Sequence, residues 1–301
     1  MDRHTILFTT DKRQRHLGEL LFGKKHTCSF EECMRESKQL FENTIGKVQK
    51  IYVFPTPVSK LSKEPKLVQK IKDELEKESL LMQWGCKRQE PSIVFGGAFT
   101  SDWLEFFEIN HISYVDFMKL EDVVEGNAQI TAEGVIAEVL NVSPFSIEGQ
   151  NVIVTGYGHC AKPIAKKLKT LGANVIVVAR KELARQEAEK EGYEVADFVK
   201  VQEFAKDCTT LINTVPALVI TEEILKKLSK DAVVIDIASK PGGVDFASAK
   251  ELGIFAKLAL GLPAVYTTKS SAKLFEKAIS ECALLKEYER EDKAWIFQII
   301  I

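Results

Sequence analysis

Two glycines separated by one residue are the feature of this sequence with the clearest chemical meaning. They lie in the run NVIVTGYGHCA, residues 151–161. A glycine at 156 permits a tight turn at the end of a strand, and a glycine at 158 lets the backbone approach a pyrophosphate because it has no Cβ. The phosphates would bind the free backbone N–H groups of a helix that begins near His159. The pattern predicts a dinucleotide-binding turn formed by Gly156, Tyr157, Gly158, His159, Cys160 and Ala161.

The residues around this turn predict a complete strand, helix and strand. An apolar, β-branched run precedes the glycines, an amphipathic helix ending at Gly172 follows them, and a second apolar run, NVIVV, occupies 174–178. This context supports a dinucleotide site far better than the glycines alone, because glycine-rich turns also occur in many loops that bind no ligand.

The end of the second strand indicates which dinucleotide would bind. An NAD site usually has Asp or Glu there to bind the ribose 2′-hydroxyl, whereas this chain has Ala179, Arg180 and Lys181. A guanidinium binds a 2′-phosphate bidentately and gains nothing comparable from a neutral ribose. We therefore predict NADP(H) as the cofactor. The alternative is that Arg180 is an ordinary solvated residue at the start of a helix, and equal affinity for NAD(H) and NADP(H) would exclude our prediction.

Composition limits the class of protein. The chain has 301 residues, 45% of them hydrophobic and 28% charged, which is enough for two domains with buried cores. The net charge of −2 comes from interspersed acidic and basic residues, so neither nucleic acid nor a membrane is an expected partner. Six cysteines without a CxxC pair suit a reducing cytoplasm, and the N-terminus has no signal-peptide pattern. Five scattered histidines indicate no metal site.

Apolar strands alternate with amphipathic helices along the whole chain, which predicts an α/β fold of two doubly wound, Rossmann-like domains with mostly parallel sheets. We place a substrate-side domain at 1–126 and the cofactor domain at 127–301. An interdomain helix would begin after a polar segment at 127–134 and continue over 135–140. The apolar tail at 294–301 would pack on its own subunit or, alternatively, contact another chain.

From Asn127 onward the sequence resembles the A subunit of dipicolinate synthase, a sporulation enzyme of endospore-forming bacteria. The motifs that carry the resemblance are Asn127 with TAEG at 131–134, GYG at 156–158, Ala179-Arg180, INTVP at 212–216, DIASKPGGVDF at 236–246, and GLP at 261–263 with Lys269. The first domain matches more loosely, through DKRQ at 11–14 and Pro55. The sequence departs from the pattern at Ile130, where a proline is expected, at Lys240, where arginine is frequent, at Ala161, which replaces the third glycine, and at Ser270-Ser271.

The resemblance implies the reaction and its partners. It implies oxidation of dihydrodipicolinate, or a hydroxylated precursor of it, to dipicolinate with NADP⁺ as hydride acceptor, in a homo-oligomer that works with a flavoprotein-like B subunit. It also places the remaining cofactor contacts in later loops, at Thr214, Val215, Pro216, Ala238, Ser239, Gly261, Leu262 and Pro263. Because loss of a hydride and a proton makes an aromatic ring, a strong base is not required.

A dicarboxylate substrate needs cations and hydroxyls to hold it. Our candidates for this role are Arg13, Thr131, Ser239, Lys240 and Lys269. Glu133 is the candidate general base, since it would start a helix near the cleft, but a first-turn carboxylate favoured by the helix dipole is an equal interpretation.

Two other functions remain open. D-2-hydroxyacid dehydrogenases share the cofactor domain but need a late histidine, and the stretch GLPAVYTTK at 261–269 has none. A regulatory or redox-sensing subunit that binds NADP without chemistry of its own is the other alternative. Formation of dipicolinate by the purified chain, with or without a B subunit, would discriminate between them.

Overall fold

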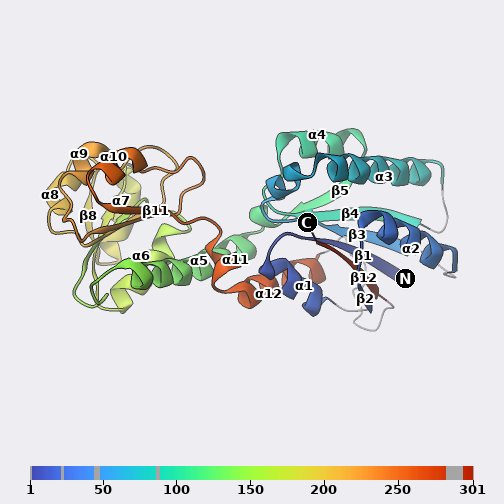
Figure 1. Cartoon of the computed structure of the whole chain (residues 1–301), viewed down its shortest axis with the longest axis horizontal. Coiled ribbons are helices and arrows are strands. Elements are labelled where there is room, and N and C mark those ends of the chain that lie inside the picture. Colours follow the sequence, from blue (N-terminus) through green and yellow to red (C-terminus); the bar gives the residue numbers. More distant parts are fainter. Residues whose placement is uncertain (1, 22–23, 44–47, 86–88, 283–293, 301) are drawn as a thin grey trace. The chain divides into compact units, whose positions relative to one another are not determined.

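The computed structural model describes residues 2–21, 24–43, 48–85, 89–282 and 294–300, which form two compact α/β units (Figure 1). The first unit comprises the residues up to Val124 together with those from Thr268 onward, and the second runs from Glu125 to Thr267. Both units are built on a parallel sheet, so the predicted fold class is confirmed.

The first unit contains a six-stranded sheet in the order β2-β12-β1-β3-β4-β5, with all neighbouring strands parallel. Chain order reverses between β1 and β3, so the strands on either side are reached in opposite directions. This is the arrangement of a doubly wound sheet, in which ligands bind outside the carboxyl ends at the point of reversal. The strands are β1 (Asp2–Thr9), β2 (Lys24–Thr27), β3 (Val48–Val53), β4 (Gln89–Gly96), β5 (Ser113–Asp116) and β12 (Ala294–Ile300).

Helices cover both faces of this sheet because alternate residues of each buried strand point to opposite sides. Phe8, Tyr52 and Val94 pack under α2, α3 and α4, while Leu7, Val53 and Phe95 pack under α1 and α12. The helical elements are α1 (Lys12–Leu20), α2 (Phe30–Asn43), η1 (Val58–Lys63), α3 (Pro65–Gln83), α4 (Ser101–Ile109), η2 (Phe117–Lys119) and α12 (Thr268–Ser280).

The second unit has a six-stranded parallel sheet in the order β11-β10-β9-β6-β7-β8, which is the strand order of a dinucleotide-binding domain. Its point of reversal lies between β6 and β9. The strands are β6 (Asn151–Thr155), β7 (Asn174–Val178), β8 (Glu194–Ala196), β9 (Thr210–Asn213), β10 (Val233–Asp236) and β11 (Phe255–Leu258).

Two apolar layers enclose this second sheet. One joins α5, α6 and α11 to Val152, Val154 and Val177, and the other joins α8, α9 and α10 to Ile153 and Val178. The helices are α5 (Glu121–Val142), α6 (Ala161–Thr170), α7 (Glu182–Lys190), α8 (Val201–Ala205), α9 (Glu222–Leu225), α10 (Phe246–Glu251) and α11 (Leu262–Val265). None of the helices described is long and apolar enough to cross a membrane.

The C-terminal segment differs from the sequence-based assignment of 127–301 to one domain. Helix α12 and strand β12 belong to the first unit, where β12 lies between β1 and β2. Its backbone pairs with β1 over seven residues and with β2 over four. The physical reason is that a strand in this position satisfies the backbone N–H and C=O groups of both neighbours. The apolar tail is therefore part of a sheet within its own chain.

Helix α5 is also longer than predicted. It begins at Glu121 and continues without a break through the polar segment 127–134, crossing from the first unit into the second after Val124. Gly134 allows this helix to approach α11, because a Cβ at that position would lie 2.7 Å from the Leu262 Cβ. The expectation of a helix that starts near residue 133 or 135 is wrong, because its polar residues are interior helical residues.

Candidate functional site

The glycine turn after β6 adopts the conformation that the sequence predicts. Gly156 has a φ of 86°, and its N–H donates to the Val178 carbonyl at 2.8 Å, which connects the turn to the end of β7. A Cβ on Gly156 would lie 2.6 Å from the Thr214 hydroxyl. At Gly158, by contrast, a Cβ would meet no atom within 4 Å. The chain is therefore open where a phosphate would approach.

Helix α6 begins at Ala161, two residues later than expected, with Cys160 as its N-cap residue. The Lys162 N–H already donates to the Gly158 carbonyl at 3.1 Å, so the helical turn includes His159 and Cys160. Free N–H groups at the start of this ten-residue helix provide the positive end that a pyrophosphate favours.

A pocket of about 500 Å³ lies along the turn at the carboxyl edge of the sheet. Seven of the predicted cofactor residues line it: Gly156, Tyr157, Gly158, Arg180, Lys181, Val215 and Pro216. Its remaining lining residues were not predicted from the sequence as cofactor contacts, and they are Ala179, Ala184, Phe198, Ala217 and Val219. Phe198 follows β8, a three-residue strand too short to give a recognisable pattern. The pocket has the size and the mainly apolar lining expected of a site for a flat heterocycle.

Arg180 is exposed at the mouth of this pocket, and its side chain makes no hydrogen bond or ion pair with any residue in the described ranges. A neighbouring arginine holds the loop. Arg185 donates to the Ala179 carbonyl at 2.7 Å and to the Arg180 carbonyl at 2.9 Å, and it also pairs with Glu182. The Arg180 cation is thus available to a ligand, and Arg185 fixes the backbone that presents it.

The side chain of Tyr157 is buried against neighbouring side chains of the second unit. Its ring meets Tyr193 edge-on at 6.0 Å, and the Lys162 ammonium lies 5.4 Å from the ring centroid. Burial raises the pKa of the Tyr157 hydroxyl, and Glu191 adds to the effect. The residue is therefore a neutral part of the pocket wall.

Three buried polar side chains join the carboxyl ends of β6, β9 and β10. Thr155 donates its hydroxyl to the Asn213 oxygen at 2.6 Å, and the Asn213 amide donates to the Asp236 carboxylate at 2.8 Å. All three side chains are fully buried. Asp236 also accepts from the N–H groups of Ala238 and Gly243, at 2.9 and 2.7 Å. Because a buried carboxylate must be hydrogen-bonded, this network fixes the loops that follow the strands.

Gly243, in the loop after β10, also contacts the loop after β9. The Gly243 carbonyl accepts from the N–H groups of Val219 and Ile220, so the loop after β9 rests on it. A Cβ on Gly243 would lie no farther than 2.6 Å from the carbonyl oxygens of Val215 and Ala217 and from the Asn213 amide. The motifs INTVP and DIASKPGG therefore form one interlocked structure that shapes the pocket wall.

The other predicted cofactor residues do not line this pocket. The Thr214 hydroxyl donates to the Thr155 carbonyl at 2.7 Å. His159 and Ser239 are exposed, Cys160 is half-buried, and Ala161, Ala238, Leu262 and Pro263 are buried. Gly261 is left-handed, with a φ of 66°, and starts α11. Their contact with a cofactor stays a prediction.

The candidate substrate residues of the second unit lie on α5 and after β10. The Thr131 hydroxyl donates to the Asn127 carbonyl within the helix, at 2.7 Å. Glu133 is 54% exposed and pairs with Lys167 at 3.2 Å. Because α5 starts at Glu121, Glu133 is a mid-helix residue, so its expected position in a first helical turn is wrong. Its role as a general base stays a prediction. Ser239 and Lys240 are exposed in the turn after β10.

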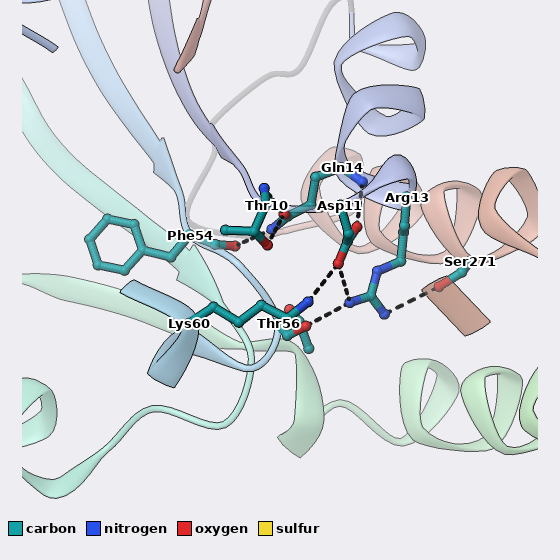
Figure 2. Close-up of polar contacts among 8 residues, drawn as sticks. All are labelled: Thr10, Asp11, Arg13, Gln14, Phe54, Thr56, Lys60 and Ser271. Carbon is teal, nitrogen blue, oxygen red and sulfur yellow. Dashed lines mark hydrogen bonds and ion pairs between the residues drawn. The ribbon is translucent and has the colours of Figure 1, made fainter. Parts of the chain in front are cut away.

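The other two candidates belong to the first unit. Lys269 is exposed near the start of α12, and Arg13 is buried in the first turn of α1. Figure 2 shows Arg13 among residues from three segments, namely Asp11 at the start of α1, Thr56 and Lys60 after β3, and Ser271 on α12. The structure therefore divides the six predicted substrate residues between the two units.

Known proteins resemble this chain in a consistent way. Residues 127–258 match the family model described as the NAD-binding domain of S-adenosyl-L-homocysteine hydrolase, which supports a nicotinamide dinucleotide as the cofactor. The chain is 31% identical over 178 residues to the A subunit of dipicolinate synthase from Bacillus subtilis, a match that covers 59% of each protein. It is 35% identical over 89 residues to the adenosylhomocysteinase of Thermoplasma volcanium, which is 30% of this chain and 21% of that one.

The fold of the whole chain also has a counterpart of known structure. A crystal structure of the A subunit of dipicolinate synthase from Bacillus halodurans matches with a TM-score of 0.71 and 23% identity, covering 95% of this chain and 98% of that one. The resemblance inferred from the motifs is therefore confirmed. The matched region spans about three fifths of the Bacillus subtilis relative, so activity, substrate and partners are matters for proposal.

Proposed function

We propose that this chain is an NADP-dependent oxidoreductase that oxidises dihydrodipicolinate, or its hydroxylated precursor, to dipicolinate in spore formation, in a homo-oligomer that works with a B subunit. The observation that carries the proposal is the pocket at the glycine turn, with the unpaired Arg180 at its mouth within the described part of the chain. The identity to the A subunit from Bacillus subtilis supports the choice of substrate.

The side chains would divide the work as follows. The N–H groups at the start of α6 would hold the pyrophosphate, and Arg180 would bind the 2′-phosphate. The network of Thr155, Asn213 and Asp236 would keep the loops rigid, so that the substrate is oriented at no entropic cost during reaction. NADP⁺, when bound, accepts a hydride. The ring of dihydrodipicolinate loses that hydride and one proton and becomes an aromatic pyridine, which makes a dedicated strong base unnecessary. The hydroxylated precursor would first lose water to give the same dihydropyridine ring.

The test is direct. The purified chain is mixed with NADP⁺ and dihydrodipicolinate, with and without the B subunit, and the absorbances of dipicolinate and of NADPH are followed together. We expect one NADPH for each dipicolinate formed, and a much slower reaction with NAD⁺. Dipicolinate formation without cofactor reduction, or no product in any combination, would refute the proposal.

A second candidate function is a cofactor-binding subunit that has no chemistry of its own. This alternative is favoured because two predicted substrate residues already have partners within the second unit. The Thr131 hydroxyl donates to the carbonyl of Asn127 in its own helix, and Glu133 forms an ion pair with Lys167. In that case NADP(H) would bind to the purified chain, but hydride transfer would occur only when the B subunit is added.

A further inference from the structure

The first unit has a cluster of charged residues at the reversal point of its sheet (Figure 2). Asp11 and Arg13 follow β1, and Thr56 and Lys60 follow β3, so the two segments meet outside the carboxyl ends of neighbouring strands. Doubly wound sheets bind their ligands at this place. The cluster combines two cations with one carboxylate.

Arg13 is buried, but its N–H donors have few close hydrogen-bond acceptors among the described residues. Its side chain is 6% exposed, and a guanidinium has five N–H donors. One short hydrogen bond is present, from Nη2 to the Thr56 carbonyl at 2.7 Å. Ser271 lies at 3.5 Å and the Asp11 carboxylate at 3.6 Å, while Nε has no hydrogen-bond partner among the described residues. Burial lowers the pKa of Arg13, an effect that Asp11 opposes.

The Asp11 carboxylate forms an ion pair with Arg13 at 3.6 Å, but its shorter contacts are with other groups. Its carboxylate accepts from the Lys60 ammonium at 2.6 Å and from the Gln14 N–H at 3.1 Å, where it caps α1. Burial alone would raise the pKa of Asp11, but Arg13 and Lys60 together hold it below its ordinary value. Arg13 and Lys60 thus share the Asp11 carboxylate, which lies 2.6 Å from the ammonium and 3.6 Å from the guanidinium.

A second unsatisfied group lies on the residue that Arg13 contacts. The hydroxyl of Thr56 is buried and has no hydrogen-bond partner within the described ranges, although the carbonyl of the same residue binds Arg13. The phenyl ring of Phe275 lies beneath the guanidinium, 4.8 Å from its centre, and fixes its plane. Buried polar groups are normally paired, so two unpaired groups in one place indicate a missing polar partner.

We propose that Arg13 and Thr56 form a subsite for one carboxylate of a small ligand, and that Lys60 keeps Asp11 from occupying it. A planar carboxylate accepts two parallel hydrogen bonds from one edge of a guanidinium, and it can also accept one from the hydroxyl. The proposal deepens the proposed function, on which its choice of a dicarboxylate rests, by naming the group in the first unit that binds one end of the substrate.

Thr56→Val is the decisive variant because it keeps the shape of the side chain and removes only the hydroxyl. In the ligand-free protein the Thr56 hydroxyl is buried and unpaired, so its removal should leave the stability of the fold unchanged or improve it. If the hydroxyl binds a carboxylate, affinity for dipicolinate falls about 10- to 100-fold while the melting temperature does not fall.

Lys60→Gln provides an independent test. It frees Asp11 to pair more closely with Arg13, so dipicolinate affinity should fall. Lys63 is an exposed lysine on the same short helix, so Lys63→Gln should have no effect. The full-length protein is titrated calorimetrically with dipicolinate, with malonate and with inorganic phosphate. We expect both dicarboxylates to bind and phosphate to bind more weakly.

The results distinguish failure of the carboxylate subsite from failure of the proposed oxidation reaction. Oxidation of dihydrodipicolinate with unchanged KM in both Thr56→Val and Lys60→Gln would overturn the subsite and leave the reaction intact. Dipicolinate binding that depends on Thr56 and Lys60, without any turnover, would support the subsite and overturn the reaction. Failure of both dicarboxylates to bind the wild type, or tighter binding of phosphate, would also overturn the subsite.

Discussion

The substitution Gly158→Ala separates cofactor binding from folding. A Cβ at this position meets no atom within 4 Å, and the backbone of Gly158 is outside the left-handed region. Alanine is therefore compatible with the folded chain, and its smaller unfolded-state entropy should stabilise the protein by up to about 1 kcal/mol. If a pyrophosphate lies against this turn, the added methyl group would occupy the space it needs.

The expected loss of affinity follows from the size of that overlap. Inserting one carbon into a closely packed contact costs about 1–3 kcal/mol, which corresponds to a rise of about 5- to 150-fold in the Kd for NADPH. Gly243→Ala is the matched contrast. Its Cβ would overlap two carbonyl oxygens and the Asn213 amide, so it should lower the stability of the second unit by about 3 kcal/mol or more.

The assay combines NADPH fluorescence titration with thermal unfolding of both variants. Gly158→Ala should lose NADPH affinity while its melting temperature equals or slightly exceeds that of the wild type, whereas Gly243→Ala should melt about 6–12 °C lower. Unchanged NADPH affinity in folded Gly158→Ala would refute the assignment of the phosphates to this turn. A lower melting temperature for Gly158→Ala would show instead that the residue packs inside the protein.

Three further predictions concern the cofactor phosphate, the C-terminal strand and the thiols. Arg180→Ala should raise the Kd for NADPH at least about 10-fold and leave the Kd for NADH unchanged. Arg185→Lys should weaken NADPH binding less than Arg180→Ala does. Equal effects of Arg180→Ala on NADH and NADPH would contradict a contact with the 2′-phosphate. Removing residues 294–301 takes a strand from between β1 and β2, so circular dichroism should show loss of the first unit, and a native-like melting curve would contradict the sheet order. Burial raises the pKa of Cys208 to about 12, so iodoacetamide at about pH 8 should leave it unmodified in the folded protein, as peptide mass mapping would show.

Local patterns were sufficient to predict much of the second unit. The strands at β6, β7 and β9 are continuous apolar runs, and the helix expected at 182–190 is α7. The first unit was harder to predict. Strand β2 has the sequence KKHT, which lacks an apolar pattern, and α2 was not predicted even though it is fourteen residues long. Glu133 was misplaced because its helix begins twelve residues earlier, within a segment whose polar residues resembled a loop.

The sequence by itself determined the glycine turn, the cation at the end of β7 and the α/β class, because each depends on residues close together in the chain. Tertiary structure decided which distant residues meet. It placed β12 between β1 and β2, because strand pairing depends on backbone hydrogen bonds that any sequence can make. It also brought Asp11, Arg13, Thr56 and Ser271 together, although 258 positions separate Arg13 from Ser271. Whether a buried cation is satisfied depends on such contacts, and only the folded chain reveals them.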